Sequence, residues 1–117
     1  MGKRILVIDD NKDILEIITI TLKCEGFEVI SSDNADIFSE LESIKPDLIL
    51  LDNWIGNIRG SDLCKTLKDN KAFSHIPVIL LSAVHDLEML ANECQADAYL
   101  EKPFELIELE TIVHQLA

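Results

Sequence analysis

Three short segments of the chain are almost wholly aliphatic, and they constrain the fold more than any other feature. They are RILVIDD at 4–10, DLILLD at 47–52 and PVILLSA at 77–83. Their apolar residues are continuous rather than alternating, which indicates strands buried on both faces, as in a parallel sheet covered by helices. FEVISS at 27–32 and AYLEK at 98–102 are weaker strand candidates, and we expect them toward the edges of the sheet.

Amphipathic helical patterns fill the gaps between these segments. Residues 11–24 carry one apolar face, and Gly26 follows where a C-terminal cap is expected. Asp33 is expected to cap a second helix that ends before Pro46. Further helices fit residues 60–67, 86–93 and 106–116, the last with an inner side of Leu106, Leu109, Ile112, Val113 and Leu116. Five strands alternating with five helices predict an α/β fold with an open, doubly wound sheet.

The net charge is the property of the composition that most limits function. The chain has 10 Lys and Arg against 22 Asp and Glu, a net charge of −12. Such a surface repels phosphate groups, so we expect no nucleic-acid binding by this domain. The length fits one domain, residues 1–117. Since no apolar run could span a membrane and no signal segment is evident, we expect no membrane association and a cytoplasmic location.

The cysteines do not suggest a metal motif. Cys24, Cys64 and Cys94 are odd in number, with no CxxC pair or histidine cluster beside them. We expect core or half-buried thiols in a reducing compartment.

Polar residues gather where the predicted strands end. These are Asp9 and Asp10, then Asp52, Ser82 and Lys102. In doubly wound sheets, functional groups collect at the carboxyl ends of the central strands. Carboxylates brought this close repel one another unless a cation shares the site, and Mg²⁺ accepts oxygen ligands of this kind. With a lysine to pair with an anion and a hydroxyl to donate to it, the site is suited to hold a phosphoryl group beside a carboxylate.

Four motifs resemble the receiver domain of two-component response regulators. They are VIDDN at 7–11, PDLILLD at 46–52, PVILLSA at 77–83 and ADAYLEKPF at 96–104. The resemblance extends from Lys3 through the last helix. It implies a flavodoxin-like (βα)5 fold with a five-stranded parallel sheet in the order 2-1-3-4-5.

The resemblance also implies roles for the acidic site. Asp52 is the expected phosphoacceptor, a carboxylate nucleophile that receives phosphoryl from a sensor histidine kinase or a phosphotransfer protein. The implied cofactor is Mg²⁺, held by Asp10, Asp52 and the backbone carbonyl of Trp54, with Asp9 acting mainly through water. Lys102 would neutralise charge on the phosphoryl group.

Other positions match the switching apparatus of the family. Ser82 would bond to a phosphoryl oxygen after transfer, and Tyr99 matches the aromatic switch position. The bond before Pro103 is expected to be cis. The change would reach the surface of the fourth helix, fifth strand and fifth helix, where receiver domains usually meet partners. The downstream partner or effector domain is not defined, a homodimer is left open, and we expect either a stand-alone receiver or part of a longer protein.

Two residues are expected to tune the lifetime of the phosphorylated state. Trp54 and Val84 stand two places beyond the phosphoacceptor and the switch hydroxyl, where they would exclude attacking water and slow self-dephosphorylation. The chain also departs from the family, with Ile55 and Gly56 where Met-Pro is usual and Gln95 where Gly is common. Neither departure removes a site group.

Purely structural interpretations of several of these residues, and other functions for the domain, remain as alternatives. Asp9 and Asp10 could simply cap the first helix, Tyr99 could be a half-buried edge-strand residue, and Trp54 could pack outward and leave the water path open. An aspartyl phosphatase or phosphotransferase is an alternative function, but Asn53 follows Asp52 and no DxD pair is present. A pseudo-receiver that binds partners without phosphorylation is a third, and the complete set of site residues argues against it.

Overall fold

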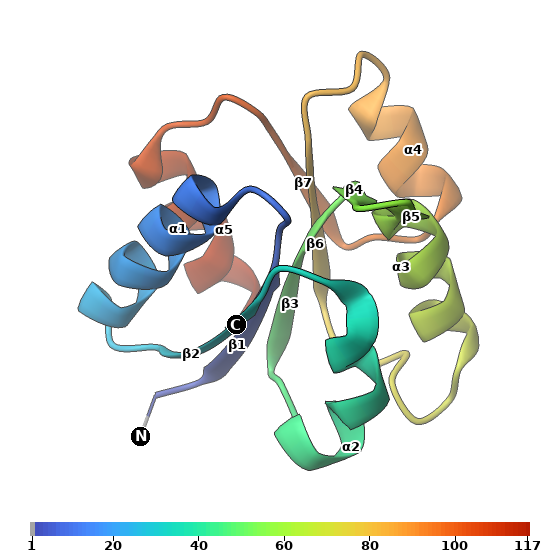
Figure 1. Cartoon of the computed structure of the whole chain (residues 1–117), viewed down its shortest axis with the longest axis horizontal. Coiled ribbons are helices and arrows are strands. Elements are labelled where there is room, and N and C mark those ends of the chain that lie inside the picture. The colour runs from blue at the N-terminus through green and yellow to red at the C-terminus, as the bar shows by residue number, and fades with distance from the viewer. Residues whose placement is uncertain (1) are drawn as a thin grey trace.

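The sheet predicted from the aliphatic segments is present in the computed structural model, which describes residues 2–117 (Figure 1). Its strands are β1 (Arg4–Ile8), β2 (Glu28–Ser32), β3 (Leu48–Asp52), β6 (Val78–Ser82) and β7 (Ala98–Glu101). Neighbouring strands are parallel, in the spatial order β2-β1-β3-β6-β7. Counted along the chain, this is the predicted flavodoxin-like order 2-1-3-4-5. The weaker segments β2 and β7 form the edges, as expected.

Helices cover both faces of the sheet (Figure 1). On one face lie α1 (Lys12–Cys24) and α5 (Leu106–Leu116), and on the other α2 (Leu41–Ile44), α3 (Gly60–Asp69) and α4 (Leu87–Glu93). Successive strand residues enter different cores: Leu50 packs with α1 and α5, whereas Leu51 packs with the other helices. Both side chains are completely buried. Burial on both faces accounts for the continuous apolar runs in the sequence.

The first helix has the termini that the sequence predicts. The Asn11 side-chain oxygen accepts hydrogen bonds from the N–H groups of Asp13 at 3.1 Å and Ile14 at 3.2 Å, which caps the helix. Gly26 follows the end of the helix with φ +92°, a conformation that glycine adopts readily.

The second helical segment departs from the prediction. Asn34 rather than Asp33 is the cap, and its side-chain oxygen accepts the N–H of Asp36 at 2.9 Å. The segment begins as a 3₁₀ helix, η1 (Ala35–Glu40), and only its last turn, α2, is α-helical. No residue of η1 is buried, whereas Leu41 at the start of α2 is. Tertiary packing, which supplies most of the stability of helices in proteins, is therefore available only at the end of the segment.

Two predicted inward positions are wrong. Leu106 is 45% exposed, because it lies in the first turn of α5 and lines a surface groove with Ile14 and Ile17 instead of entering the core. Cys24 is exposed, since it is the last residue of α1 and follows the buried Leu22 on a different side of the helix.

After β3 the chain forms a short antiparallel hairpin, which the sequence does not predict. It consists of β4 (Trp54–Ile55) and β5 (Ile58–Arg59). Gly56 takes the first position of the two-residue turn with φ +62°, and a glycine at that position is typical of tight hairpins. The hairpin connects the end of β3 directly to α3.

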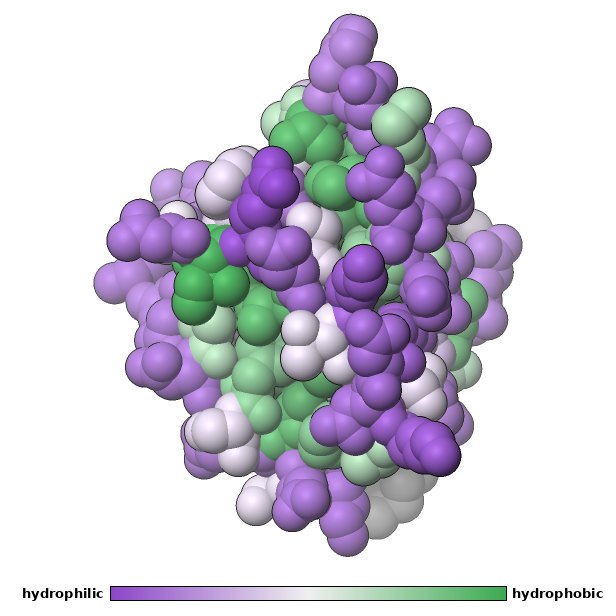
Figure 2. Space-filling model, turned by 90° about the vertical axis from the view of Figure 1, so that its right-hand side faces the viewer, coloured by the Kyte–Doolittle hydropathy of each residue, from purple (hydrophilic) through white to green (hydrophobic). Residues whose placement is uncertain are grey.

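The surface reflects the acidic composition. The face that carries α3 and α4 is largely hydrophilic, with an apolar strip running through it (Figure 2). Among residues 2–117, no helix combines the length and the apolarity needed to cross a membrane.

Candidate functional site

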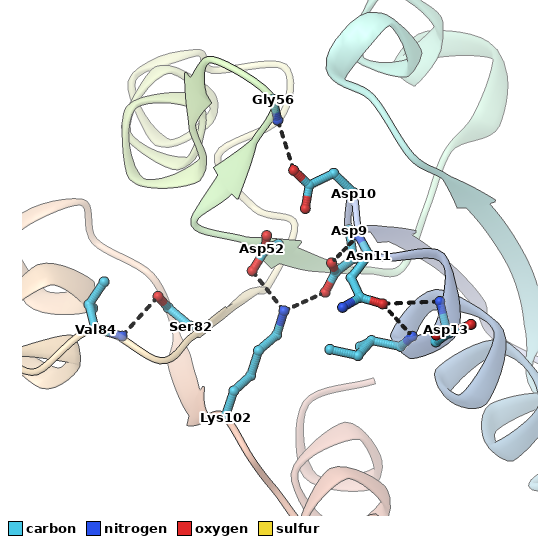
Figure 3. A network of polar contacts seen from close by, with 10 residues as sticks. Asp9, Asp10, Asn11, Asp13, Asp52, Gly56, Ser82, Val84 and Lys102 are labelled. Carbon is cyan, nitrogen blue, oxygen red and sulfur yellow. Dashed lines mark hydrogen bonds and ion pairs between the residues drawn. The ribbon is translucent and has the colours of Figure 1, made fainter.

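The carboxyl ends of the central strands bring the predicted acidic residues together (Figure 3). Asp9 and Asp10 follow β1, and Asp52 ends β3. One carboxylate oxygen from each lies within 4.8 Å of the others. Asp9 is completely buried and Asp52 is 7% exposed, whereas Asp10 lies at the surface. The cluster therefore has a buried floor and an open mouth.

Lys102 completes the cluster from the end of the edge strand β7, which β6 separates from β3. Its ammonium group donates to Asp9 Oδ2 at 2.7 Å and to Asp52 Oδ1 at 3.0 Å (Figure 3). The lysine side chain is only 16% exposed. Ion pairs with so little access to water are screened less than surface pairs, so this contact fixes both carboxylates relative to β7.

The protonation equilibria of the pair follow from burial and from the pair itself. Burial would lower the pKa of Lys102, but the hydrogen bonds that its ammonium group donates to Asp9 and Asp52 outweigh this effect and hold that pKa above its ordinary value. Burial raises the pKa of Asp52; the hydrogen bond from Lys102 opposes this, and the neighbouring charges of Asp9 and Asp10 add to it. The site thus keeps its lysine charged and makes the Asp52 carboxylate more basic than an exposed one.

Backbone groups hold the two acidic residues after β1. Asp9 Oδ1 accepts the N–H of Asn11 at 2.9 Å, at the start of α1. Asp10 Oδ2 accepts the N–H of Gly56 at 3.1 Å, in the turn of the β4–β5 hairpin (Figure 3). The hairpin is therefore tied to the acidic cluster.

The sequence did not lead us to predict the hydrogen bonds of Asn53, the buried polar residue that follows Asp52. Asn53 is 2% exposed, and its side-chain oxygen accepts the N–H of Ser61 at 3.2 Å. Its backbone oxygen accepts the N–H of Gly60 at 2.6 Å. The two bonds join the end of β3 to the start of α3 and close the hairpin segment. A glycine inside the first turn of a helix, where it is a poor helix former, was the available sign of such a close approach.

Replacing Gly60 by alanine is expected to destabilise the protein strongly. An added Cβ would lie 2.0 Å from the backbone oxygen of Asp52, a contact that only a backbone shift could relieve. We expect the free energy of unfolding to fall by ~3 kcal/mol, measured by urea denaturation. Gly56→Ala is the matched control: no atom lies within 4 Å of its Cβ, and only the φ of +62° costs about 1 kcal/mol. Equal losses in the two variants would contradict the close-packing argument.

The remaining predicted residues lie around the cluster at different distances from it. Ser82 ends β6, is 4% exposed, and its hydroxyl accepts the N–H of Val84 at 3.1 Å (Figure 3). The Lys102–Pro103 bond is cis, as the resemblance implies. Tyr99 is not brought into the cluster, because it lies on edge strand β7 and is 40% exposed.

Trp54 and Val84 line one surface cavity beside the site, of about 300 Å³. The indole is 47% exposed, and the Arg59 guanidinium lies over it, 5.4 Å from the ring centroid. Val84 is half-buried. A cation over an aromatic face stabilises the position of the ring, so the hairpin holds the indole at the rim of this cavity.

The donor set of the cluster fits a hard divalent cation. Hard cations prefer carboxylate and carbonyl oxygens, and the three carboxylates are close enough to share one ion. Lys102 supplies one positive charge against three carboxylates, which leaves negative charge to be balanced. Asp9 already uses one oxygen for Lys102 and the other for Asn11, so Asp10 and Asp52 are the better placed direct ligands.

A flavodoxin-like sheet with this cluster at its carboxyl edge defines the class of receiver domains. Comparison with known proteins agrees: residues 5–114 match the family model described as the response regulator receiver domain. The chain belongs to this family. It is therefore a signalling domain of the two-component type.

Relatives with this domain include regulators of transcription. The DNA-binding response regulator MtrA of Mycobacterium tuberculosis (strain ATCC 25618 / H37Rv) is 37% identical over 112 residues, covering 93% of this chain and 48% of MtrA. The alkaline phosphatase synthesis transcriptional regulatory protein PhoP of Bacillus subtilis (strain 168) is 36% identical over 107 residues, covering 89% of this chain and 44% of PhoP. This chain thus spans about half the length of the curated relatives it matches.

A similar solved structure comes from a different kind of parent protein. It is the signal receiver domain of a signal transduction histidine kinase from Syntrophus aciditrophicus, with a TM-score of 0.88 and 29% sequence identity. The match covers 98% of this chain and 89% of that one. Membership of the family therefore does not depend on the kind of protein that carries the domain.

Proposed function

We propose that this domain accepts a phosphoryl group on Asp52 from a sensor histidine kinase or a phosphotransfer protein, with Mg²⁺ as cofactor. The observation that carries the proposal is the position of the Asp52 carboxylate, 3.0 Å from the ammonium of Lys102 and grouped with two further carboxylates. A nucleophile, a fixed cation and a set of metal ligands thereby surround one point at the edge of the sheet.

The residues divide the work of phosphoryl transfer among them. A carboxylate oxygen of Asp52 attacks phosphorus, the bond from phosphorus to the donor breaks, and the leaving group takes its electron pair. Lys102 is held in place to neutralise charge on the transferred group. When bound, Mg²⁺ would neutralise further charge on the phosphoryl oxygens. Asp10, Asp52 and the Trp54 carbonyl would hold it directly, with Asp9 acting through water.

Signalling would follow from contacts made only after transfer. The Ser82 hydroxyl would donate its proton to a phosphoryl oxygen, and it can do so while its oxygen still accepts the N–H of Val84. The change would reach Tyr99 and the surface of α4, β7 and α5, where Met89, Tyr99 and Ile107 are exposed. Such a switch shifts a two-state equilibrium through differential contacts to phosphoryl.

The output of the parent protein would lie outside this domain. MtrA is a DNA-binding response regulator and PhoP a transcriptional regulatory protein. With a net charge of −12, the domain itself is unsuited to bind the phosphate backbone of a nucleic acid. A partner protein or an attached domain would therefore receive the signal from the α4–β7–α5 surface.

The direct test of the proposal is phosphorylation by a small donor. Incubation with Mg²⁺ and acetyl phosphate should add one phosphoryl group per chain, measured by intact-mass spectrometry. Peptide mapping at a pH that preserves acyl phosphates should locate it on Asp52. No mass increase, or a modification on another residue, would contradict the proposed function.

Binding of Mg²⁺ should be measurable without any phosphodonor. Trp54 is the only tryptophan and lies in the hairpin tied to Asp10, so its fluorescence should change on titration. We expect a dissociation constant in the millimolar range or tighter, ~4 kcal/mol or more of binding free energy. Asp10→Asn should weaken binding, whereas Asp13→Asn, an exposed carboxylate on α1, should not. Constant emission together with no heat in calorimetry would exclude a metal site.

A further inference from the structure

Two buried thiols meet between α3 and the end of α4, on the side of the sheet away from α1 and α5. Cys64 is completely buried and Cys94 is 3% exposed. The Cys64 thiol donates to the backbone oxygen of Cys94 at 3.4 Å, and the Cys94 thiol donates to that of Ala91 at 3.5 Å. The contact confirms the expectation of core thiols for this pair and adds that they are neighbours. The phosphorylation chemistry uses neither.

The two thiols are chemically unequal. The proximity of the two thiols raises the pKa of Cys64, to which burial adds, and lowers the pKa of Cys94, so the thiolate is favoured on Cys94. The thiolate is the form of cysteine that reacts with oxidants and disulfides. Cys94 is thus the better nucleophile, and Cys64 is placed to react with it afterwards.

A small reagent can approach this pair from the surface. A cavity of about 160 Å³ opens between the hairpin, α3 and α4, and Cys94 forms part of its lining together with Arg59 and Lys65. Both cysteines belong to the core between the sheet and these helices, but Cys64 is completely buried and is not part of the cavity lining. Cys94 is therefore the thiol that a reagent in the cavity would meet first, and Cys64 is the more deeply buried of the two.

We propose that Cys64 and Cys94 are a thiol modification site, which a hydroperoxide such as hydrogen peroxide converts to a disulfide joining α3 to the end of α4. The Cys94 sulfur attacks one peroxide oxygen, the O–O bond breaks, and hydroxide leaves and takes up a proton to give water. Cys94 is then a sulfenic acid. The Cys64 sulfur attacks the Cys94 sulfur, the S–O bond breaks, and a second water leaves with the Cys64 proton. Two thiols are oxidised, and one peroxide is reduced to two waters.

The disulfide would constrain the part of the molecule that surrounds the phosphorylation site. It closes the segment 64–94, which includes β6, the Ser82–Val84 turn and α4. It would therefore restrict movement of α4 relative to α3. The modification itself does not depend on phosphorylation of Asp52, so the two can be tested separately.

The test uses the folded chain carrying Cys24→Ser, which removes the exposed thiol and with it cross-links between molecules. After treatment with hydrogen peroxide and alkylation of free thiols, non-reducing peptide mapping should give a peptide pair joined through residues 64 and 94. Intact mass should fall by two hydrogen atoms. The thermal unfolding midpoint should rise by roughly 10 °C and return on reduction with dithiothreitol.

A variant that also carries Cys64→Ser supplies the matched control. It should keep Cys94 reactive, leave it as a sulfenic acid that a dimedone probe traps, and show no rise in the midpoint. Alkylation of both thiols in the peroxide-treated folded chain, or a disulfide that forms only in urea, would overturn the proposal. Because the measurements involve no phosphodonor, they stand whether or not Asp52 is phosphorylated.

Discussion

Replacing Asp52 by asparagine is expected to abolish phosphoryl uptake from acetyl phosphate while leaving the fold intact. The amide keeps the shape of the carboxylate but is not a nucleophile toward phosphorus. No other carboxylate of the cluster can replace it: Asp9 is completely buried with both oxygens engaged, and Asp10 is turned toward the hairpin turn, where it accepts the N–H of Gly56. We expect uptake to fall to the background of an unreactive protein.

The fold should survive because the Asp52 carboxylate does not stabilise it. Burial raises the pKa of Asp52 above that of the unfolded chain, so the folded state binds this proton more tightly than the unfolded state does. For an acid with a raised pKa, ionisation lowers the stability of the folded state, and the loss is present at pH values above the folded pKa. A neutral amide at this position avoids that loss. The amide also gives up the charge that pairs with Lys102, but Lys102 keeps Asp9 as its partner, so we expect the unfolding free energy of Asp52→Asn at neutral pH to stay close to that of the wild type.

Both expectations can be checked in one set of samples. Intact mass after incubation with Mg²⁺ and acetyl phosphate measures uptake, and urea denaturation measures stability. Asp62→Asn is the control, since this exposed carboxylate on α3 lies outside the acidic cluster, and it should be labelled like the wild type. Full labelling of a folded Asp52→Asn variant would show that another residue is the acceptor.

The strands and the strand-end cluster could be predicted because both follow from short-range patterns. A run such as ILVI can be continuously apolar only where both faces are buried, and the structure buries it completely. Once those runs are parallel strands, their carboxyl ends share one edge, which predicts that Asp9, Asp52 and Lys102 lie at the same edge of the sheet. No knowledge of side-chain packing is needed for that step.

The features that were missed depend on packing between elements. Asn53 accepts hydrogen bonds from Gly60 and Ser61 because α3 starts against the end of β3. No local sequence pattern encodes how closely those two elements pack. The meeting of Cys64 with Cys94 likewise depends on how α3 packs beside α4. Leu106 fits the periodicity of its helix, but it lies in the first turn, lines a surface groove and stays 45% exposed. Periodicity gives the side of a helix that faces inward, not the length over which a neighbour covers it.

The phosphorylated state is expected to decay slowly, and the reason lies in Trp54 and Val84. Water hydrolyses an aspartyl phosphate by attacking in line with the bond that breaks, and positioning that water is worth orders of magnitude in rate. Trp54 and Val84 line the same cavity of about 300 Å³, whose lining also includes Asn53, the residue that follows Asp52. The Arg59 guanidinium holds the indole, and the bond from the Val84 N–H to the Ser82 hydroxyl holds the other side chain. Neither side chain can orient a water through a hydrogen bond from the approach side.

Trp54→Asn with Val84→Glu is therefore expected to speed self-dephosphorylation by on the order of tenfold or more, because amide and carboxylate groups can orient the attacking water. Decay of the protein labelled with acetyl phosphate, followed by intact mass after removal of the donor, measures the rate. Ile58→Asn controls for loss of an exposed apolar side chain from the same hairpin, since Ile58 is 44% exposed and lies outside the lining of the cavity. The two single variants divide the effect between the hairpin and the turn after β6.

With the indole 47% exposed, the competing arrangement is one in which the ring points outward and leaves the water path open. Decay in the double variant that is equal to or slower than in the wild type would establish that arrangement and show that neither side chain guards the phosphoryl group.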